Sequence, residues 1–248
     1  MSQNRMLIVG DRFEQFAQHP QVLSISAAEA LLQGETLDHN LRLQLGQGIS
    51  SPRLDGLLGL AESHKKRQLL AFDRPEKAGR QLAHKHDPRN SMISLPRRVG
   101  PSSFVLDVWL DEDCAELSDH MTGQHIQGMV LLEATRQAFL AVTEEFYLKD
   151  TPHSSYFVIN QMDTEYLHFV FPLPISILYE IEDYQAGKRD THRFQVSMSV
   201  IQNETVCCVV KTRFSTYPDS FISSKEEGLA RAALEQELYG EAQHEKRA

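Results

Sequence analysis

One segment near the middle of the chain, residues 128–146, has a helical pattern and is apolar on nearly every side. Its apolar residues are Met129, Val130, Leu131, Leu132, Ala134, Ala138, Phe139, Leu140 and Val142. A helix without a broad polar face is buried on most sides and does not lie on a surface. The fold must therefore supply a layer that surrounds this helix.

Strand-like segments flank the helix in the sequence. Two precede it, at residues 92–99 and 104–110, with Gly100 and Pro101 between them, and four follow it, at residues 156–159, 175–182, 194–201 and 206–215. Residues 202–204 are typical of a hairpin turn. An antiparallel sheet wrapped around one central helix satisfies both patterns, which predicts an α+β protein with a hot-dog fold. Such sheets commonly pair edge to edge, so we expect a homodimer.

The first 60 residues or so follow a different pattern, in which short apolar runs alternate with helical pieces. Strands are predicted at residues 6–10, 22–26 and 41–45, and helices at 13–19 and 27–33. This alternation predicts a small α/β unit. We therefore divide the chain into the α/β unit (1–60), a basic helical linker (61–83), a hot-dog domain (84–217) and a C-terminal helical tail (218–248), with its helix at 224–245. Asp11, just after the first strand, is interpreted as a turn-capping acid in preference to a ligand-binding residue.

The charge of the chain restricts its partners. With 25 Lys and Arg against 34 Asp and Glu, the net charge of −9 argues against general nucleic-acid binding. Residues 61–100 are nevertheless rich in Lys and Arg, which indicates either a solvated face or a patch for an anionic partner such as a carrier protein or a phosphate ester. No apolar run is long enough for a membrane span, and three cysteines do not form a disulfide framework, so a cytoplasmic location is expected.

The polar residues of the central helix are the first candidates for chemistry. Glu133, Arg136 and Gln137 are spaced three and four apart, which places them on one face. An unpaired buried carboxylate costs several kcal/mol, so Glu133 must be paired, protonated or facing a cavity. Two interpretations remain open. A Glu133–Arg136 pair orders a dimer interface, or desolvation raises the pKa of Glu133 and suits it to general acid–base work.

The loop before the helix offers a second set of candidates. Gly128 at the start of the helix lets a substrate approach free backbone N–H groups, which are suited to hold a carbonyl oxygen or an oxyanion. His120 and His125 frame a glycine-containing loop that leads to the buried acid. His120 is therefore a candidate for orienting a substrate or moving a proton, although a lone loop histidine is usually polar surface.

Two stretches carry a family resemblance: DHMTGQHIQGMVLLEATRQAFLAVTEEF and, upstream, LAHKHDPRNSMISLPRRV. Over about residues 82–216 the chain resembles the hot-dog domain of the AfsA-type A-factor (γ-butyrolactone autoregulator) synthases. His84, the Arg97–Arg98 pair, the D-H loop and the LLEATRQ helix occur in the family's order. A weaker similarity extends to the hot-dog β-hydroxyacyl-carrier dehydratases.

The resemblance implies acyl transfer from a β-ketoacyl thioester on acyl carrier protein to the hydroxyl of dihydroxyacetone phosphate. On that template Glu133 deprotonates or orients the hydroxyl, with His120 as the second catalytic residue, and the helix start at Gly128 and Met129 holds the thioester carbonyl. Arg136, Arg97 or Arg98 binds the phosphate, and the other substrate-binding candidates are Gln137, Gln124, His125 and His84. Actinobacterial members carry two hot-dog repeats, and this chain has one, so a homodimer would supply the second half.

Two other functions remain compatible with these residues. The same fold serves thioester hydrolysis or dehydration of a β-hydroxyacyl thioester, and a hot-dog groove can also hold an acyl ligand without turnover. No histidine pair has the spacing of a helix-borne metal site, no G-x-S-x-G motif is present, and no G-x-G-x-x-G motif is present. We therefore expect neither a metal nor a cofactor.

Overall fold

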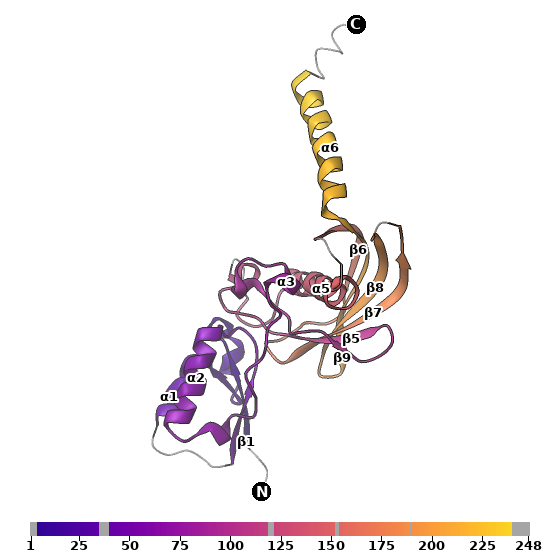
Figure 1. Cartoon of the computed structure of the whole chain (residues 1–248). Helices are drawn as coiled ribbons and strands as arrows, with labels where there is room; N and C mark the ends of the chain where they lie inside the picture. Colours follow the sequence, from indigo (N-terminus) through magenta and orange to yellow (C-terminus); the bar gives the residue numbers. More distant parts are fainter. Residues whose placement is uncertain (1–3, 35–39, 119–121, 152–153, 189, 240–248) are drawn as a thin grey trace.

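The computed structural model describes residues 4–34, 40–118, 122–151, 154–188 and 190–239 (Figure 1). Its larger part is a six-stranded antiparallel sheet in the order β4-β5-β7-β8-β9-β6. The strands are β4 (Arg97–Arg98), β5 (Ser103–Val108), β6 (Ser155–Tyr166), β7 (Ile175–Ala186), β8 (His192–Gln202) and β9 (Thr205–Pro218). The sheet curves around one long helix, α5 (Gly128–Thr143), so the prediction of a hot-dog fold is confirmed.

The central helix is buried as its sequence predicts, with eleven of its sixteen residues inside the core. The strands that face it alternate in burial, as in β8, where Phe194, Val196, Met198 and Val200 point inward. The predicted hairpin between β8 and β9 forms at Asn203 and Glu204, which both have positive φ (49° and 62°). Such a pair of residues is typical of the tight turns that match the twist of paired strands.

Several predicted elements have different limits in the structure. The strand expected at residues 92–99 is reduced to β4 and isolated bridges at Ile93 and Ser94, because Pro96 has no N–H and the N–H of Met92 is bonded to a side chain. The helix expected at 13–19 is two 3-10 turns, η1 (Asp11–Phe13) and η2 (Phe16–Gln18). Beyond α5 the chain continues as a π-helical turn, η5 (Glu144–Leu148).

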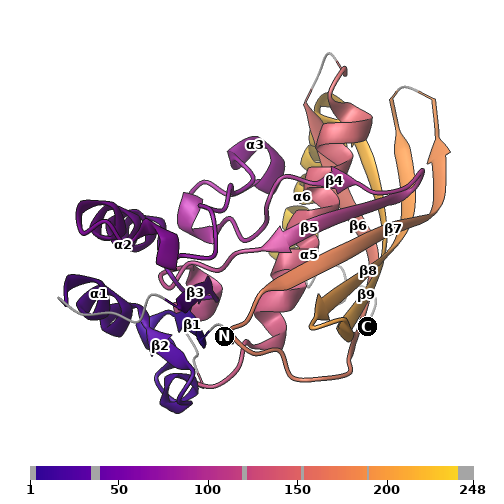
Figure 2. The ribbon, with the colours of Figure 1, turned by 90° about the horizontal axis from the view of Figure 1, so that it is seen from below.

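The N-terminal part contains a three-stranded parallel sheet in the order β2-β1-β3, made of β1 (Asn4–Val9), β2 (Val22–Ser24) and β3 (Leu41–Leu45). Helices α1 (Ile25–Gln33) and α2 (Ser51–Ser63) cover one face, and the hot-dog part lies on the other (Figure 2). Ile8 packs into the core below the helices, whereas Leu7 and Val9 belong to the hot-dog core. Covering both faces accounts for the unbroken apolar run in β1.

A buried glutamine is one of the links between the two parts. Gln47, which is 1% exposed, donates from Nε2 to the carbonyl of Val108 (2.9 Å) and accepts at Oε1 from the N–H of Leu110 (2.9 Å). Its own N–H donates to the carbonyl of Pro172 (3.1 Å). The chain around it is closely packed, since the Cβ of any other residue at Gly10 would overlap the backbone of Gly48. The turn that follows β3 in the N-terminal sheet is therefore hydrogen-bonded directly to the end of β5 in the hot-dog sheet.

The segment between the two sheets folds over α5. It contains η3 (Arg67–Leu69), α3 (Arg80–Ala83) and η4 (Pro88–Asn90), and the short helix α4 (Ala115–Ser118) lies beside it. At the other end of the chain, α6 (Asp219–Tyr239) begins five residues before the predicted helix and projects away from the body (Figure 1). Ile222 is its buried residue. None of the described helices is long and apolar enough to cross a membrane.

Candidate functional site

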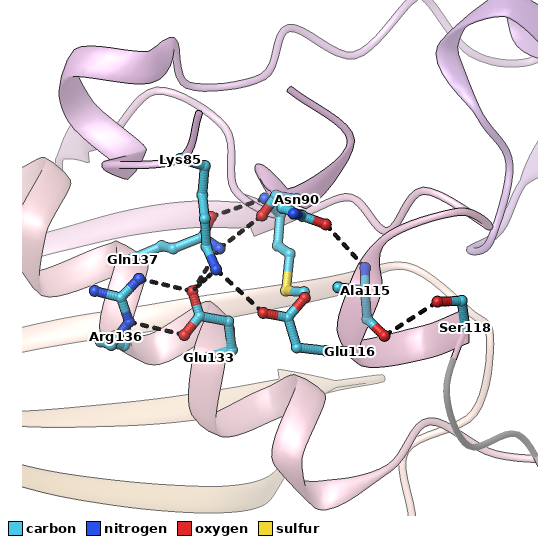
Figure 3. A network of polar contacts seen from close by, with 9 residues as sticks. Lys85, Asn90, Ala115, Glu116, Ser118, Glu133, Arg136 and Gln137 are labelled. Carbon is cyan, nitrogen blue, oxygen red and sulfur yellow. Dashed lines mark hydrogen bonds and ion pairs between the residues drawn. The ribbon is translucent and has the colours of Figure 1, made fainter. Parts of the chain in front are cut away.

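Glu133 lies on the face of α5 that the segment after α3 covers, and its side chain is 14% exposed (Figure 3). Its Oε2 accepts from Arg136 Nε (2.7 Å). Its Oε1 accepts from Arg136 Nη2 (2.9 Å) and Gln137 Nε2 (2.9 Å), and it forms an ion pair with Lys85 Nζ (2.8 Å). The helical spacing therefore brings Glu133, Arg136 and Gln137 together, as the sequence predicts.

Lys85 connects Glu133 to a second acid. It follows α3 in the chain and donates to Glu116 Oε1 on α4 (3.1 Å) as well as pairing with Glu133. Its side chain is 17% exposed, so this cation is held between two carboxylates and largely out of water. The ammonium thus fixes the position of both acids.

Gln137 attaches the covering segment to the helix. Its Oε1 accepts from the N–H of Met92 (2.8 Å), and its Nε2 donates to the carbonyl of Asn90 (2.8 Å) as well as to Glu133. Asn90 in turn accepts from the N–H of Ala115 at the start of α4 (2.8 Å). The carboxylate of Glu133 is therefore bonded by its own helix and by Lys85, and the polar network extends from there through Asn90 to α4.

The charge state of Glu133 follows from these bonds. Burial raises the pKa of the carboxyl, but the hydrogen bonds from Arg136, Lys85 and Gln137 together outweigh burial and hold the pKa below its ordinary value. The expectation that desolvation raises this pKa is therefore wrong. Glu133 is a fixed anion at neutral pH, which suits it to accept a hydrogen bond from a substrate hydroxyl and orient it.

The start of α5 forms a second feature. Helix α5 begins at Gly128 after Gln127, whose side chain makes no capping bond, so the first N–H groups have no acceptor within the helix. A groove of about 740 Å³ opens here, between the loop that ends at Gln127 and the segment that follows β6. Gln127 Nε2 is buried there without a hydrogen-bond partner among the described residues. The groove thus offers several unsatisfied donors.

Glycine is required at the first position of α5. A Cβ on Gly128 would lie 2.7 Å from Cε1 of Tyr166, which packs across the helix start from the end of β6. Met129 follows, 63% exposed and lining the groove. Since Met129 and Glu133 are four residues apart, they lie on the same side of α5, one turn from each other. A ligand that crosses Met129 from the groove therefore approaches Glu133.

The loop residues predicted from the sequence are only partly described. His120 lies outside the described residues. His125 lines the groove, with its Nδ1 3.2 Å from Thr122 Oγ1 and its ring edge-on to Phe169 at 5.0 Å. The N–H of Gln124 donates to Thr122 Oγ1 (3.3 Å), so Gln124 shapes the loop through its backbone.

Three other candidates lie apart from the Glu133 network and have partners of their own. His84 Nε2 is 3.0 Å from Glu144 Oε1 on η5. Arg97 donates to Asp107 (2.8 Å). Arg98 lies over the rings of Phe104 and Phe146, at 4.6 and 4.8 Å from their centroids.

Sequence patterns did not indicate Lys85, Glu116 and Asn90 as members of the site. Lys85 is next to His84 in the basic stretch, so its residue type was visible, but its pairing with an acid 48 positions later had no local signal. Within the described residues, no three His, Cys, Asp or Glu side chains are grouped so that they could hold a metal ion.

A family model described as "A-factor biosynthesis hotdog domain" (AfsA) matches residues 68–218, more than half of the chain. No match was found among curated proteins. A mutant thioesterase from Pseudomonas aeruginosa is 13% identical over 51% of this chain and 81% of its own (TM-score 0.37). A thioesterase from Haemophilus influenzae is 13% identical over 51% and 78% (TM-score 0.36).

Proposed function

Because this chain belongs to the AfsA family of A-factor biosynthesis hot-dog proteins, we propose that it is an acyltransferase. It joins a β-ketoacyl group, delivered as a thioester on acyl carrier protein, to the hydroxyl of a phosphorylated acceptor such as dihydroxyacetone phosphate. The product would serve as a precursor of a γ-butyrolactone or butenolide signal or of a related secondary metabolite. We also propose a reducing, cytoplasmic location, since Cys114, Cys207 and Cys208 are free thiols.

The observation that carries this proposal is the ionised, largely buried carboxylate of Glu133. Its Oε2 accepts one bond, from Arg136, so this oxygen retains capacity for a bond from the acceptor hydroxyl. The cations Lys85 and Arg136 keep the carboxylate ionised. They also supply positive charge near the oxygen of the acceptor hydroxyl, on which negative charge develops as this oxygen attacks the thioester. Glu133 therefore acts by orienting the nucleophile.

The thioester is proposed to lie in the groove at the start of α5. The unsatisfied N–H groups of Gly128 and Met129 are suited to hold its carbonyl oxygen, and the helix dipole favours the oxyanion that forms there. In the reaction, the acceptor oxygen bonds to the thioester carbon and the carbon–sulfur bond breaks. The hydroxyl proton passes to the departing sulfur, which leaves an ester and a free thiol.

The loop before α5 supplies the second catalytic residue in this proposal. We assign the proton transfer to His120, which precedes the described loop residues 122–127. Gln124 and His125 are proposed to shape the thioester end of the groove, since His125 lines it directly.

A homodimer is part of the proposal. Strand β6 pairs with β9 on one side only and forms an edge of the sheet. Apolar side chains are exposed along it and beyond it, among them Ile159, Tyr166 and Phe169, the last at 71%. An open edge flanked by apolar surface favours pairing with a second strand. A second copy there would supply the other hot-dog unit.

The test is mass spectrometry of the products from a β-ketoacyl thioester, with and without dihydroxyacetone phosphate. We expect an acyl–triose phosphate ester from the wild type and a loss of at least about a hundredfold in Glu133→Gln. Glu145→Gln is the matched control, because Glu145 is paired with Lys149 outside the site. This control should retain activity.

The products decide between the functions. A free acid or a dehydrated product that forms without the triose would replace the acyltransferase by a thioesterase or a dehydratase. A bound acyl ligand without any turnover, unchanged in Glu133→Gln, would indicate a binding protein.

A further inference from the structure

A hollow of about 500 Å³ lies beside Lys85, between the start of α2 and the segment that carries α3 and η4. Its walls are strongly basic: the cationic or titratable side chains are Arg74, Lys77, Arg80, Lys85, His86 and Arg89, against the acids Glu76 and Asp111. The excess of positive charge in a concave site favours an anionic ligand. The groove proposed for the thioester lies elsewhere, at the start of α5, so this hollow is a separate feature.

Several of these cations already have partners. Arg74 is bonded to Asp55 at 2.6 Å, and Arg89 is paired with Asp87 at 2.6 Å. Arg80 differs from them, because among the described residues it forms no ion pair or side-chain hydrogen bond. Its guanidinium therefore has all its donors available on the wall of the hollow.

Lys77 is the more unusual residue. Its Nζ is buried and has no hydrogen-bond partner within the described part of the chain. Burial lowers the pKa of this ammonium, and the attraction of the Asp111 carboxylate offsets burial only in part. A buried ammonium without a partner is costly, and an anion within reach would remove most of that cost. Lys77 is also one of the residues that line the hollow, so an anion held there lies beside this side chain.

We propose that this hollow binds the phosphate group of a phosphorylated substrate, with Lys77 and Arg80 as its donors. A phosphate has several oxygens and can accept hydrogen bonds from more than one donor at a time. Lys77 and Arg80 are three residues apart in one segment, so an ammonium and a guanidinium can bind the same phosphate. The volume exceeds that of a phosphate alone and leaves room for an attached carbon chain.

Lys85 links the hollow to the reaction. It lines the hollow and pairs with Glu133, so a short acceptor anchored by its phosphate extends toward the carboxylate that orients its hydroxyl. This inference rests on the proposed function for the identity of the acceptor. The three arginines first suggested for the phosphate are already engaged: Arg97 with Asp107, Arg98 with the carbonyl of Pro101 and Arg136 with Glu133.

The test is calorimetric titration of the full-length protein with dihydroxyacetone phosphate and with uncharged dihydroxyacetone. We expect only the phosphate ester to bind, and we expect Lys77→Met and Arg80→Gln each to weaken binding by about tenfold to a hundredfold. Arg231→Gln removes the same charge from α6 and should leave binding unchanged. Arg80 is exposed, so Arg80→Gln remains informative even if Lys77→Met folds poorly.

A second titration, with adenosine 3′,5′-bisphosphate, distinguishes the sources of phosphate. Binding of this probe with the same dependence on Lys77 and Arg80, and none of the triose phosphate, would keep the phosphate site but assign it to the coenzyme end of an acyl donor. No binding of either probe, or equal binding by wild type and both variants, would overturn the inference.

Turnover separates this inference from the proposed function. Triose phosphate that binds through Lys77 and Arg80 without ester formation would support the site and contradict the acyltransferase. Ester formation with an unchanged KM for the triose phosphate in both variants would support the acyltransferase and contradict the phosphate site in the hollow.

Discussion

The two hydrogen bonds by which the side chain of Gln47 links the N-terminal part to the hot-dog part can be tested by substitution. Gln47→Leu keeps the size of the side chain but removes the bonds to the carbonyl of Val108 and the N–H of Leu110. Gln47, Val108 and Leu110 are all buried, with at most 3% of each residue exposed, so water does not replace the lost hydrogen-bond partner. The change therefore leaves one buried acceptor and one buried donor unsatisfied.

The expected cost follows from these two groups. Each unsatisfied buried group costs about 1–3 kcal/mol, and the added apolar burial of leucine returns about 1 kcal/mol. We expect the free energy of unfolding to fall by about 1–5 kcal/mol.

Urea unfolding followed by circular dichroism measures this loss. Gln44→Leu is the matched control, because Gln44 is exposed on the neighbouring strand β3, and it should change stability by less than about 0.5 kcal/mol. A loss below about 1 kcal/mol in Gln47→Leu would show that the two bonds do not hold the parts together as argued.

Two further changes test other features. Gly128→Ala should lower the rate of acyl transfer at least about tenfold and the free energy of unfolding by about 1–2 kcal/mol, because the new Cβ meets the ring of Tyr166. Steady-state kinetics measures the first effect and thermal melts the second. Normal activity would contradict the role of the helix start. For Asp11, burial raises the pKa, but bonds from Ser26 and Arg53 outweigh it and lower the pKa to about 2. Because the ionised form is favoured in the folded state, its stabilisation is present above about pH 4 and disappears as the pH falls toward 2. Asp11→Asn should flatten the pH dependence of stability in that interval, and an unchanged slope would refute this contribution.

The elements that sequence patterns predicted correctly are those with a strong local period. Helix α5 was predictable because its residues are apolar around nearly the whole circumference, and β8 because buried residues alternate along it. The strand expected at residues 92–99 was wrong because Pro96, which lies within the run and has no N–H, interrupts its ladder; the apolar run was given more weight than this proline. Turn chemistry was sufficient to predict the hairpin at Asn203.

The candidate site was predictable only where it is local. Spacing along one helix brought Glu133, Arg136 and Gln137 together, but Lys85 comes from another segment and its pairing has no local period. The direction of the pKa shift of Glu133 depends on Lys85 as well as on Arg136 and Gln137. Burial alone therefore predicted a raised pKa, whereas the pKa is lowered. Gln47 likewise had no signal, since one buried amide in a glycine-rich turn does not indicate what it bonds to.

The position of β1 has a consequence for exchanging parts between relatives. Leu7 and Val9 complete the hot-dog core from outside the hot-dog chain segment, and Phe13 and Phe16 extend the same contact. A shortened chain that starts after the first sheet would present this apolar surface to water and would tend to associate through it. A graft onto another hot-dog protein would therefore have to carry the β1 face with it, or replace the residues that receive it.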